Sequence, residues 1–341
     1  MRPFTDVLTR IAEGERLSRS EAREAMDHIM SGEATGAQIG AFLMGLRQRG
    51  ETPEELAGAA ESMRGHATRL DTDRRPLIDT CGTGGDGAGT FNISTAAAFV
   101  VAGAGVGVAK HGNRSISSSC GSADVLEALG ARIDLAPEAS ARCLETTGVG
   151  FMFAPHYHPA ARHAAGPRRE LAMRTLFNLL GPLCNPAPLT HQIMGIFTPD
   201  LLETAAAVLG LLGMERALVV HGDGGLDEIA LSGPTRVAEW RDGAVFAYTV
   251  TPEALGVSRA PVEALAGGDA AHNAALIRAM FDGGTGPALD VVCLNAGAGL
   301  FVCGAVPGLA EGVAMARDAV TSGKARAALE GFVAFTVDAA S

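Results

Sequence analysis

The sequence predicts an α/β protein in which a small N-terminal all-helical domain precedes a larger α/β domain with a mostly parallel central sheet. Apolar residues recur at helical spacing over residues 1–68, whereas short apolar runs alternate with helical segments from residue 76 onward. The chain has 341 residues, of which 47% are hydrophobic and 44 are glycine. This length and composition favour two domains and many tight turns. We expect the active-site cleft to lie between the two domains.

The N-terminal segment is expected to form four short helices. Phe4, Val7, Leu8 and Ile11 share one apolar face at helical spacing. Three later helix starts are marked by capping boxes, in which a hydroxyl side chain precedes a Glu or Gln by three residues: Ser18 with Glu21, Thr35 with Gln38, and Thr52 with Glu55. Because such a bundle buries a modest core, we expect it to pack on another domain or subunit.

The domain boundaries follow from a change of pattern at the charged linker, residues 71–76. We expect residues 1–72 to form the helical domain, and residues 76–165 together with 191–341 to form the α/β domain. Residues from about 168 to 190 interrupt the alternation and carry basic side chains. This interruption predicts a segment that packs back onto the helical domain.

Alternating strands and helices in the α/β domain predict a parallel sheet with right-handed crossovers. Strands are expected at residues 77–80, 106–109, 133–135, 149–153, 217–220, 236–239, 245–249 and 288–294. Helices are expected at residues 95–102, 122–129, 201–212 and 271–280, with another beginning at residue 137. Residues 308–335 are expected to form helices and one edge strand.

Charge and hydropathy exclude several classes of partner. The net charge of −11 argues against nucleic acid, whose phosphate backbone usually requires a broad basic surface. The longest uncharged apolar run, residues 96–109, is too short and too rich in glycine to span a bilayer, and the first residues form no secretory signal. The six cysteines show no metal-binding spacing and are expected to be reduced. We therefore expect a cytoplasmic protein with no membrane partner.

A glycine-rich loop follows the first apolar run of the α/β domain. Residues 79–95 read Asp-Thr-Cys-Gly-Thr-Gly-Gly-Asp-Gly-Ala-Gly-Thr-Phe-Asn-Ile-Ser-Thr, with five glycines from Gly82 to Gly89. Glycine lets a backbone approach a ligand closely. The next helix, capped by Asn92 or Ser94, would direct its positive end toward an anion. The loop is therefore predicted to bind phosphate.

Two common phosphate-binding motifs fit this loop poorly. Gly82, Gly84 and Gly87 satisfy G-x-G-x-x-G, but a dinucleotide site also needs an acidic residue about 20 positions further on. No Asp or Glu stands between Asp86 and Asp124, so the dinucleotide interpretation is weak. No Gly-Lys-Ser/Thr follows either, which excludes a Walker loop.

Two cationic residues, Lys110 and Arg114, follow the second apolar run, within the sequence Lys-His-Gly-Asn-Arg. The carboxyl ends of neighbouring parallel strands meet at one edge of a sheet, so these cations would face the ligand of the glycine loop. Phosphate binding is the favoured interpretation, and a solvated turn is the alternative. The ligand is expected to carry several negative charges.

Asp227 and Glu228 are candidate metal ligands. They follow the strand expected at 217–220 and a glycine loop. Adjacent carboxylates there suit Mg²⁺, which prefers oxygen ligands and shares them with substrate phosphates. The alternative is a pair of surface acids. Ser94 offers a further hydroxyl to the metal, unless it only caps its helix.

Arg168 is the candidate for binding a substrate carboxylate, because a guanidinium can pair with it in bidentate fashion. A surface salt bridge with Glu170 is the alternative, and the sequence does not rank the two. His111, His156 and His158 have no acidic partner at the spacing of a catalytic triad or a zinc site.

Several motifs stand in a recognisable order. They are Gly-Thr-Gly-Gly-Asp at 82–86, Asn-Ile-Ser-Thr at 92–95, Lys-His-Gly-Asn-Arg at 110–114, Gly-Ser-Ala-Asp-Val-Leu-Glu-Ala-Leu-Gly at 121–130, Phe-Asn-Leu-Leu-Gly-Pro-Leu at 177–183 and Leu-Asp-Glu at 226–228. With this order and spacing the chain resembles the anthranilate phosphoribosyltransferase family, most strongly over residues 79–190 and 221–235. The resemblance implies Mg²⁺-assisted transfer of a phosphoribosyl group from phosphoribosyl pyrophosphate to the amine of anthranilate. It also implies a homodimer formed through the N-terminal helices.

The resemblance further implies a set of site residues. Those that would contact phosphoribosyl pyrophosphate are Gly82, Gly85, Asp86, Thr90, Asn92, Ile93, Ser94, Thr95, Lys110, His111, Gly112, Asn113, Arg114, Ser115, Ile116, Ser117, Ser118 and Ser122. Those that would contact anthranilate are Gly82, Asn113, His158 and Arg168, and those that would bind Mg²⁺ are Ser94, Asp227 and Glu228. Lys110 and Arg168 would act in catalysis. Pro167 and Ala172 depart from the family pattern beside Arg168.

Two other functions are alternatives to this interpretation. A pyrimidine nucleoside phosphorylase shares this architecture and also acts at C1 of a ribosyl group, but it would not need Asp227 and Glu228. A catalytically silent relative that binds nucleic acid is the second alternative, which the acidic composition disfavours.

Overall fold

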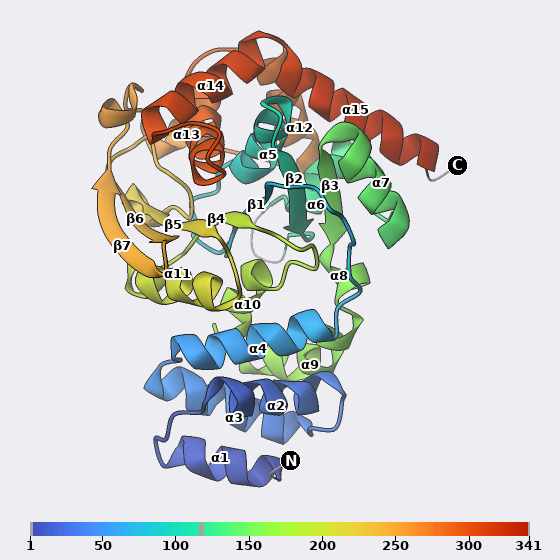
Figure 1. Cartoon of the computed structure of the whole chain (residues 1–341), viewed down its shortest axis with the longest axis vertical. Coiled ribbons are helices and arrows are strands. Elements are labelled where there is room, and N and C mark those ends of the chain that lie inside the picture. Colours follow the sequence, from blue (N-terminus) through green and yellow to red (C-terminus); the bar gives the residue numbers. More distant parts are fainter. Residues whose placement is uncertain (1–2, 116–118, 340–341) are drawn as a thin grey trace.

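A computed structural model of the chain describes residues 3–115 and 119–339. Figure 1 shows a bundle of helices at one end of the molecule and a sheet covered by helices on both faces at the other. The N-terminal end of the chain lies in the bundle, and the C-terminal helix lies on the outer side of the α/β domain. The fold class expected from the sequence is confirmed. Among the described helices, none has the length and hydropathy needed to cross a bilayer.

Four helices begin the chain: α1 (Phe4–Ala12), α2 (Arg19–Met30), α3 (Gly36–Arg49) and α4 (Pro53–Gly65). The three expected capping boxes are all present, at Ser18, Thr35 and Thr52. In each box the hydroxyl accepts a hydrogen bond from the backbone, and the Glu or Gln side chain accepts one in return. These bonds satisfy backbone donors that the first turn of a helix leaves open.

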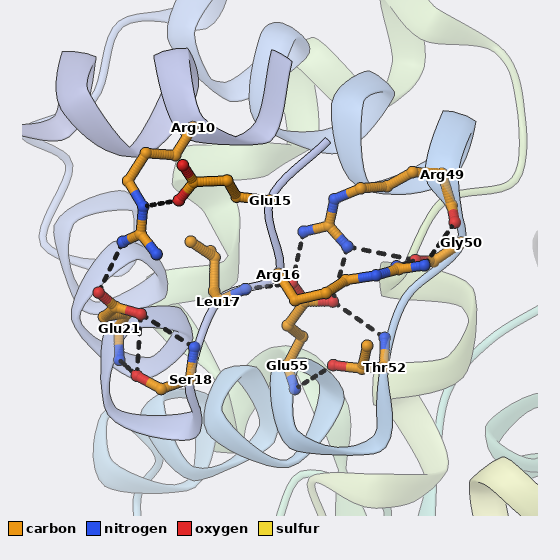
Figure 2. Close-up of polar contacts among 10 residues, drawn as sticks. All are labelled: Arg10, Glu15, Arg16, Leu17, Ser18, Glu21, Arg49, Gly50, Thr52 and Glu55. Atoms are coloured by element: carbon orange, nitrogen blue, oxygen red, sulfur yellow. Dashed lines mark hydrogen bonds and ion pairs between the residues drawn. The ribbon is translucent and has the colours of Figure 1, made fainter. Parts of the chain in front are cut away.

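A buried carboxylate ties the loops of the bundle to α4 (Figure 2). Glu55 is 2% exposed and forms an ion pair with Arg49. It also accepts hydrogen bonds from the backbone N–H groups of Leu17 at 2.7 Å and Thr52 at 2.9 Å. Burial raises the pKa of Glu55, but these hydrogen bonds outweigh it, so that the pKa is lowered. The carboxylate therefore stays charged and holds two loops in place.

The central sheet has seven strands in the order β3-β2-β1-β4-β5-β6-β7. They are β1 (Leu77–Gly82), β2 (Gly107–Gly112), β3 (Val149–Phe153), β4 (His191–Gly195), β5 (Arg216–Gly222), β6 (Thr235–Arg241) and β7 (Ala244–Val250). Strands β1 to β5 pair in parallel, and β6 and β7 add an antiparallel edge. Because β1 lies between β2 and β4, the strand order reverses beside β1. Open α/β sheets bind ligands at such a switch point.

The two faces of the sheet belong to two hydrophobic cores. Ile193 and Leu218 pack in the first core, and their neighbours Met194 and Val219 pack in the second, because side chains alternate along a strand. The main helices on the first face are α5 (Ile93–Gly103), α12 (Ala270–Phe281), α13 (Pro287–Val302), α14 (Leu309–Thr321) and α15 (Lys324–Ala339). The second core joins α11 (Leu202–Leu211) to the N-terminal bundle. The bundle is therefore packed directly against the sheet side of the molecule, as Figure 1 shows.

Residues 154–183 return the chain to the bundle. They form α8 (Ala154–Tyr157), a 3-10 turn η1 (Pro159–Ala161), α9 (Arg162–Leu171) and α10 (Phe177–Leu183). Helix α9 packs against α2 and α3, and α10 packs against α4. The remaining helices are α6 (Ser122–Ala128), α7 (Pro137–Thr147) and the 3-10 turns η2 (Pro199–Leu201), η3 (Asp223–Gly225), η4 (Glu253–Leu255) and η5 (Val262–Leu265).

Three sequence predictions of secondary structure are wrong. Residues 288–294 lie in helix α13, which has 16 residues and is buried on nearly every side, so that its apolar stretch resembles a buried strand. Residues 133–135 form no strand; they pack with α15, whose Thr336 hydroxyl accepts a hydrogen bond from the Arg132 N–H at 3.0 Å. Within residues 308–335, all of which are described, there are helices and no edge strand.

Ala172 ends helix α9 in the left-handed conformation, with φ 48° and ψ 34°. Its N–H donates to the Arg168 carbonyl at 3.2 Å, which closes the helix. A side chain at positive φ costs about 1–2 kcal/mol that glycine does not incur, although glycine loses more backbone entropy on folding.

We predict that Ala172→Gly raises the free energy of unfolding by about 0.5–1 kcal/mol, because the strain at this cap is relieved. Urea unfolding of the two proteins measures the difference. Ala327→Gly in α15 is the matched control, and it should lower stability by about 1 kcal/mol because Ala327 lies in an ordinary helical turn. A loss of stability in Ala172→Gly would contradict the argument.

Candidate active site

The glycine loop after β1 approaches the sheet edge closely enough to exclude larger residues. Gly84, Gly85, Gly87 and Gly89 all have φ between 64° and 75°, the region in which glycine is favoured. A Cβ on Gly82 would collide with the carboxylate of Asp227. Gly82 thus permits a close approach, but to a carboxylate of the same chain; close approach of the loop to a ligand stays a prediction.

The helix after this loop, α5, begins without a side-chain cap. Asn92 is the N-cap residue, but its Nδ2 donates to the Cys120 carbonyl at 3.1 Å and its Oδ1 accepts from Asn273 at 3.0 Å. Asn92 thus occupies the N-cap position expected for it, but its side chain makes no cap hydrogen bond because distant polar groups engage it, and Ser94 lies inside the helix. The backbone N–H of Ser94 instead lies near the carboxylate of Glu228 and favours its ionised form. The positive end of α5 thus already holds one negative group.

Lys110 at the end of β2 lies beneath the loop. It is 3% exposed, its Nζ donates to the Thr80 carbonyl, and the same atom lies 3.4 Å from the Ser94 hydroxyl. The carboxylates of Asp79 and Glu228 are close enough for its charge to lower the pKa of both. Lys110 therefore balances negative charge under the sheet edge.

Arg114 is placed differently from Lys110. Its side chain is exposed and pairs with Asp124 at 3.0 Å and Glu127 at 2.5 Å, both on helix α6. The sequence correctly placed both cations after the same strand, but the structure brings only Lys110 to the centre of the site.

Asp86, Asp227 and Glu228 gather negative charge at the sheet edge. The Asp227 N–H lies 3.5 Å from the Asp86 carboxylate, and the Asp227 carboxylate accepts a hydrogen bond from the Gly84 N–H at 2.8 Å. Burial, followed by the charge of Asp86, raises the pKa of Asp227 to about 7. Burial, followed by the charge of Asp227, raises the pKa of Glu228 well above its usual value.

These carboxylates fit a magnesium ion. Crowded acids with raised pKa values are stabilised by a nearby cation, and their donors are all oxygen. Within residues 3–115 and 119–339, no group of three or more His, Cys, Asp or Glu side chains is placed to hold a metal by itself. Mg²⁺ usually takes one or two carboxylates and completes its shell with water and substrate phosphate, so two carboxylates with a hydroxyl from Ser94 are sufficient.

A pocket of about 530 Å³ opens beside the loop, between the sheet edge and helices α8 to α10. Its lining includes the four residues expected to contact anthranilate, namely Gly82, Asn113, His158 and Arg168. The Arg168 guanidinium stacks over the Phe177 ring with 4.7 Å between Cζ and the ring centroid. Across the described residues Arg168 forms no ion pair, so the alternative salt bridge with Glu170 is not found. Burial lowers the pKa of Arg168, which leaves an uncompensated cation in the pocket wall.

Two histidines in this pocket are neutral. The rings of His111 and His158 lie 5.0 Å apart between centroids. Burial lowers the pKa of His111 to about 3 and that of His158 to about 4, with a smaller contribution from neighbouring positive charge. The Nε2 atoms of both are buried without a partner among the described residues. The pocket wall thus contains two uncharged imidazole rings as well as the unpaired guanidinium of Arg168.

The other residues expected to contact phosphoribosyl pyrophosphate lie around the same edge of the sheet, and they have different roles in the fold. Ile93 and Thr95 are buried in α5, and Thr90 forms a bridge with Ala266. The Ser122 hydroxyl donates to the Asn113 carbonyl at 3.3 Å, and the Ser115 N–H donates to Asp124 at 3.0 Å. His111 and Gly112 end β2. Ile116, Ser117 and Ser118 lie outside the described residues.

A buried network below the loop was not predicted from the sequence. Asn185 donates to the Asp79 carboxylate and to the Ala109 carbonyl, at 2.8 Å each. Burial raises the pKa of Asp79 to about 6. The only signal in the sequence was the position of Asp79 as the first polar residue of the buried strand, and nothing local pointed to Asn185.

The sequence matches two descriptions of one family. Residues 74–326 match the a/b domain of the glycosyl transferase family, and residues 5–67 match its helical bundle domain. The chain belongs to this glycosyl transferase family.

Within that family the similar proteins share one activity by name. The chain is 55% identical over 328 residues to the anthranilate phosphoribosyltransferase of Moorella thermoacetica, a match that covers 96% of this chain and 97% of that protein. It is 54% identical over 320 residues to that of Thioalkalivibrio sulfidiphilus, covering 94% and 95% of the two chains. The resemblance derived from the motifs is confirmed.

Solved structures agree with the fold. The crystal structure of anthranilate phosphoribosyltransferase from Thermus thermophilus is 48% identical and superposes with a TM-score of 0.93, covering 97% of this chain and 99% of that one. The enzyme from Saccharomyces cerevisiae, in complex with PRPP and Mg, has a TM-score of 0.90 at 24% identity and covers 98% of both chains. At that identity the likeness concerns the fold.

We predict that the two buried histidines make the protein less stable at mildly acidic pH. In the unfolded chain a histidine has a pKa of about 6.5, so below that pH the unfolded state binds more protons and stability falls as pH decreases toward 4. Each histidine contributes a slope of up to about 1.4 kcal/mol per pH unit.

Urea unfolding between about pH 7 and pH 4.5 tests this prediction. Most of this range lies below the pKa of a histidine in the unfolded chain. In His158→Gln the slope of stability against pH should decrease by about one proton. The exposed His272 provides the control, since His272→Gln should leave the slope unchanged. Equal slopes for wild type and His158→Gln would contradict the prediction.

Proposed function

We propose that the chain transfers the 5-phosphoribosyl group of phosphoribosyl pyrophosphate to the amine of anthranilate and releases pyrophosphate, the second step of tryptophan biosynthesis from chorismate. The main support for this proposal is that an anion site and an acceptor pocket lie next to each other. An anion site built from the glycine loop and α5 adjoins a pocket with an unpaired Arg168, and Gly82, where the loop begins, lines that pocket. A negatively charged donor and a carboxylate-bearing aromatic acceptor would thus lie side by side. The high identity to named relatives supports the same conclusion.

The donor side supplies stabilisation of the departing charge. Among the described residues, the backbone N–H groups of Gly85, Asp86 and Gly87 donate to no other protein atom, so they remain available to phosphate oxygens. Ser94, Asp227 and Glu228 would hold Mg²⁺, which supplies positive charge to the pyrophosphate leaving group. Lys110 favours the ionised form of Glu228 from below.

The acceptor side positions the amine. Arg168 would bind the anthranilate carboxylate, a charged hydrogen bond worth about 1.5–3 kcal/mol, and the ring would stack among the apolar wall residues. An aromatic amine is already neutral near neutral pH, so attack on the ribose C1 needs alignment more than a strong base. The neutral His111 and His158 line this side without adding charge.

The direct test mixes the purified protein with anthranilate, phosphoribosyl pyrophosphate and Mg²⁺ and follows anthranilate fluorescence. We expect the fluorescence to fall and pyrophosphate to appear in equal amount. Unchanged fluorescence, or phosphorolysis of uridine or thymidine in its place, would overturn the proposal in favour of a nucleoside phosphorylase.

The assembly belongs to the same proposal. We infer a cytoplasmic homodimer formed through the N-terminal helices, supported by the resemblance of the motifs to the family. Light scattering of the eluting protein should give twice the mass of the chain. A monomeric wild-type protein with full activity would contradict this inference.

We predict that Asp227→Asn together with Glu228→Gln lowers kcat about 100-fold or more, because charge stabilisation of the leaving group is lost. The assay is the fluorescence change at limiting Mg²⁺. Asp223→Asn in the preceding turn η3 is the matched control and should retain activity. Near-normal turnover of the double variant would show that Asp227 and Glu228 are not needed for catalysis.

We predict that Arg168→Ala raises the KM for anthranilate about 10- to 100-fold and changes the KM for phosphoribosyl pyrophosphate much less, because one charged hydrogen bond to the acceptor is lost. Arg169→Ala, at the exposed neighbouring position, should leave both values unchanged. An unchanged KM for anthranilate in Arg168→Ala would place the acceptor elsewhere.

A further inference from the structure

Arg174 lies in the connection from α9 to α10, two helices that contribute residues to the acceptor pocket. Its Nη2 donates to the carbonyl of Gly85, in the middle of the loop. Its guanidinium also stacks on Phe197, with 4.0 Å between Cζ and the ring centroid. Within the described residues it forms no ion pair with a carboxylate. The guanidinium of Arg174 is therefore engaged by the loop and by an aromatic ring.

Phe197 connects the same group to the sheet. It follows β4, and its N–H donates to the Thr83 hydroxyl at 3.1 Å. The Thr83 N–H in turn donates to the Gly195 carbonyl at 3.0 Å. The beginning of the glycine loop is thus fixed next to β4. Phe197 takes part in this contact through its N–H and also stacks against Arg174.

The bond to Gly85 determines which way the next amide points. A peptide group is planar and trans, so its C=O and N–H point in opposite directions. When Arg174 holds the Gly85 carbonyl, the N–H of Asp86 is directed away from Arg174. That N–H has no protein partner in the described part of the chain. The loop is otherwise free to rotate here, because Gly85 has φ 73° and no side chain.

We infer that Arg174 is a positioning residue, which fixes the Gly85–Asp86 peptide so that the Asp86 amide is presented to the donor phosphates. Phe197 holds the arginine in place by stacking. The inference rests on the proposed function, since it names the phosphate-bearing donor as the ligand of that amide. It also links the two subsites, because Arg174 stands only six residues after Arg168.

The connection that carries Arg174 is itself well defined. Ala172 closes α9, and the Thr175 N–H donates to the Asn178 side chain at 3.0 Å at the start of α10. Because both ends of this connection are fixed, Arg174 can restrict the motion of the glycine loop. Arg174 is exposed, so its replacement removes little from the hydrophobic core.

The first experiment measures hydrogen exchange in the substrate-free protein. We expect Arg174→Ala to speed amide exchange about tenfold in residues 83–89 and to leave the bundle and α13 unchanged. Arg169→Ala, which also removes one exposed arginine charge, should show wild-type exchange. Unchanged exchange over residues 83–89 in Arg174→Ala would overturn the inference, whatever the enzyme does.

The second experiment separates binding from chemistry. We expect Arg174→Ala to raise the KM for phosphoribosyl pyrophosphate about tenfold, with a small change in kcat and in the KM for anthranilate. Phe197→Leu should raise the same KM, and the double variant should be no worse than Arg174→Ala alone, because both act through one contact. Additive effects, or a normal KM in Phe197→Leu, would overturn the positioning role and indicate that Arg174 binds the donor directly.

A conservative variant tests the geometry. Lysine keeps the charge but has neither the planar face nor the fork of arginine, so Arg174→Lys should resemble Arg174→Ala. Full recovery in Arg174→Lys would contradict the inference by showing that charge alone suffices. If the wild-type protein turned over no anthranilate, the proposed function would fail, while the exchange experiment would still decide the role of Arg174.

Discussion

The site depends on the fit of one carboxylate-bearing segment between two paired strands. Gly82 of β1 and Gly195 of β4 are opposite each other in the sheet, and a Cβ on either would collide with Asp227. The missing side chains make the space in which residues 226–228 lie against the sheet edge. The glycine loop, the acidic pair and the switch point of the sheet are therefore one construction, because moving any of them displaces the others.

Charge in this construction is balanced locally. Lys110 is buried near Asp79 and Glu228, and α5 directs a backbone N–H toward Glu228. These contacts do not fully offset burial and the nearby charge of Asp86, which together raise the pKa of Asp227. The residual negative charge at the loop and the unpaired Arg168 in the adjacent pocket give the two subsites opposite electrostatic character. Such a division would orient a donor that carries metal-bound phosphates and an acceptor that carries a carboxylate.

Features of the fold and the site could be predicted from the sequence when the interacting residues are close together in the chain, and not when they are far apart in it. The capping boxes at Ser18, Thr35 and Thr52 were predicted because both partners lie within one helical turn. The cap expected at Asn92 failed because its side chain is engaged by Cys120 and Asn273, which are far away in the sequence. The run at 288–294 was assigned to a strand because short apolar segments suit a buried strand and a buried helix equally.

In the candidate site, motif order placed Asp227, Glu228 and Lys110 together correctly, since strand ends in a parallel sheet meet at one edge. The ion pairs of Arg114 with α6 and the support of the loop by Arg174 arise from packing between distant segments, which no local pattern encodes.

The two hydrophobic cores have a consequence for how this protein unfolds. Successive residues of β4 and β5 point into different cores, and one of these cores continues into the N-terminal helices. Detaching the bundle would strip one whole side of the sheet of its covering. The bundle and the sheet should accordingly melt in a single cooperative transition, even though the chain is divided into two parts by sequence pattern.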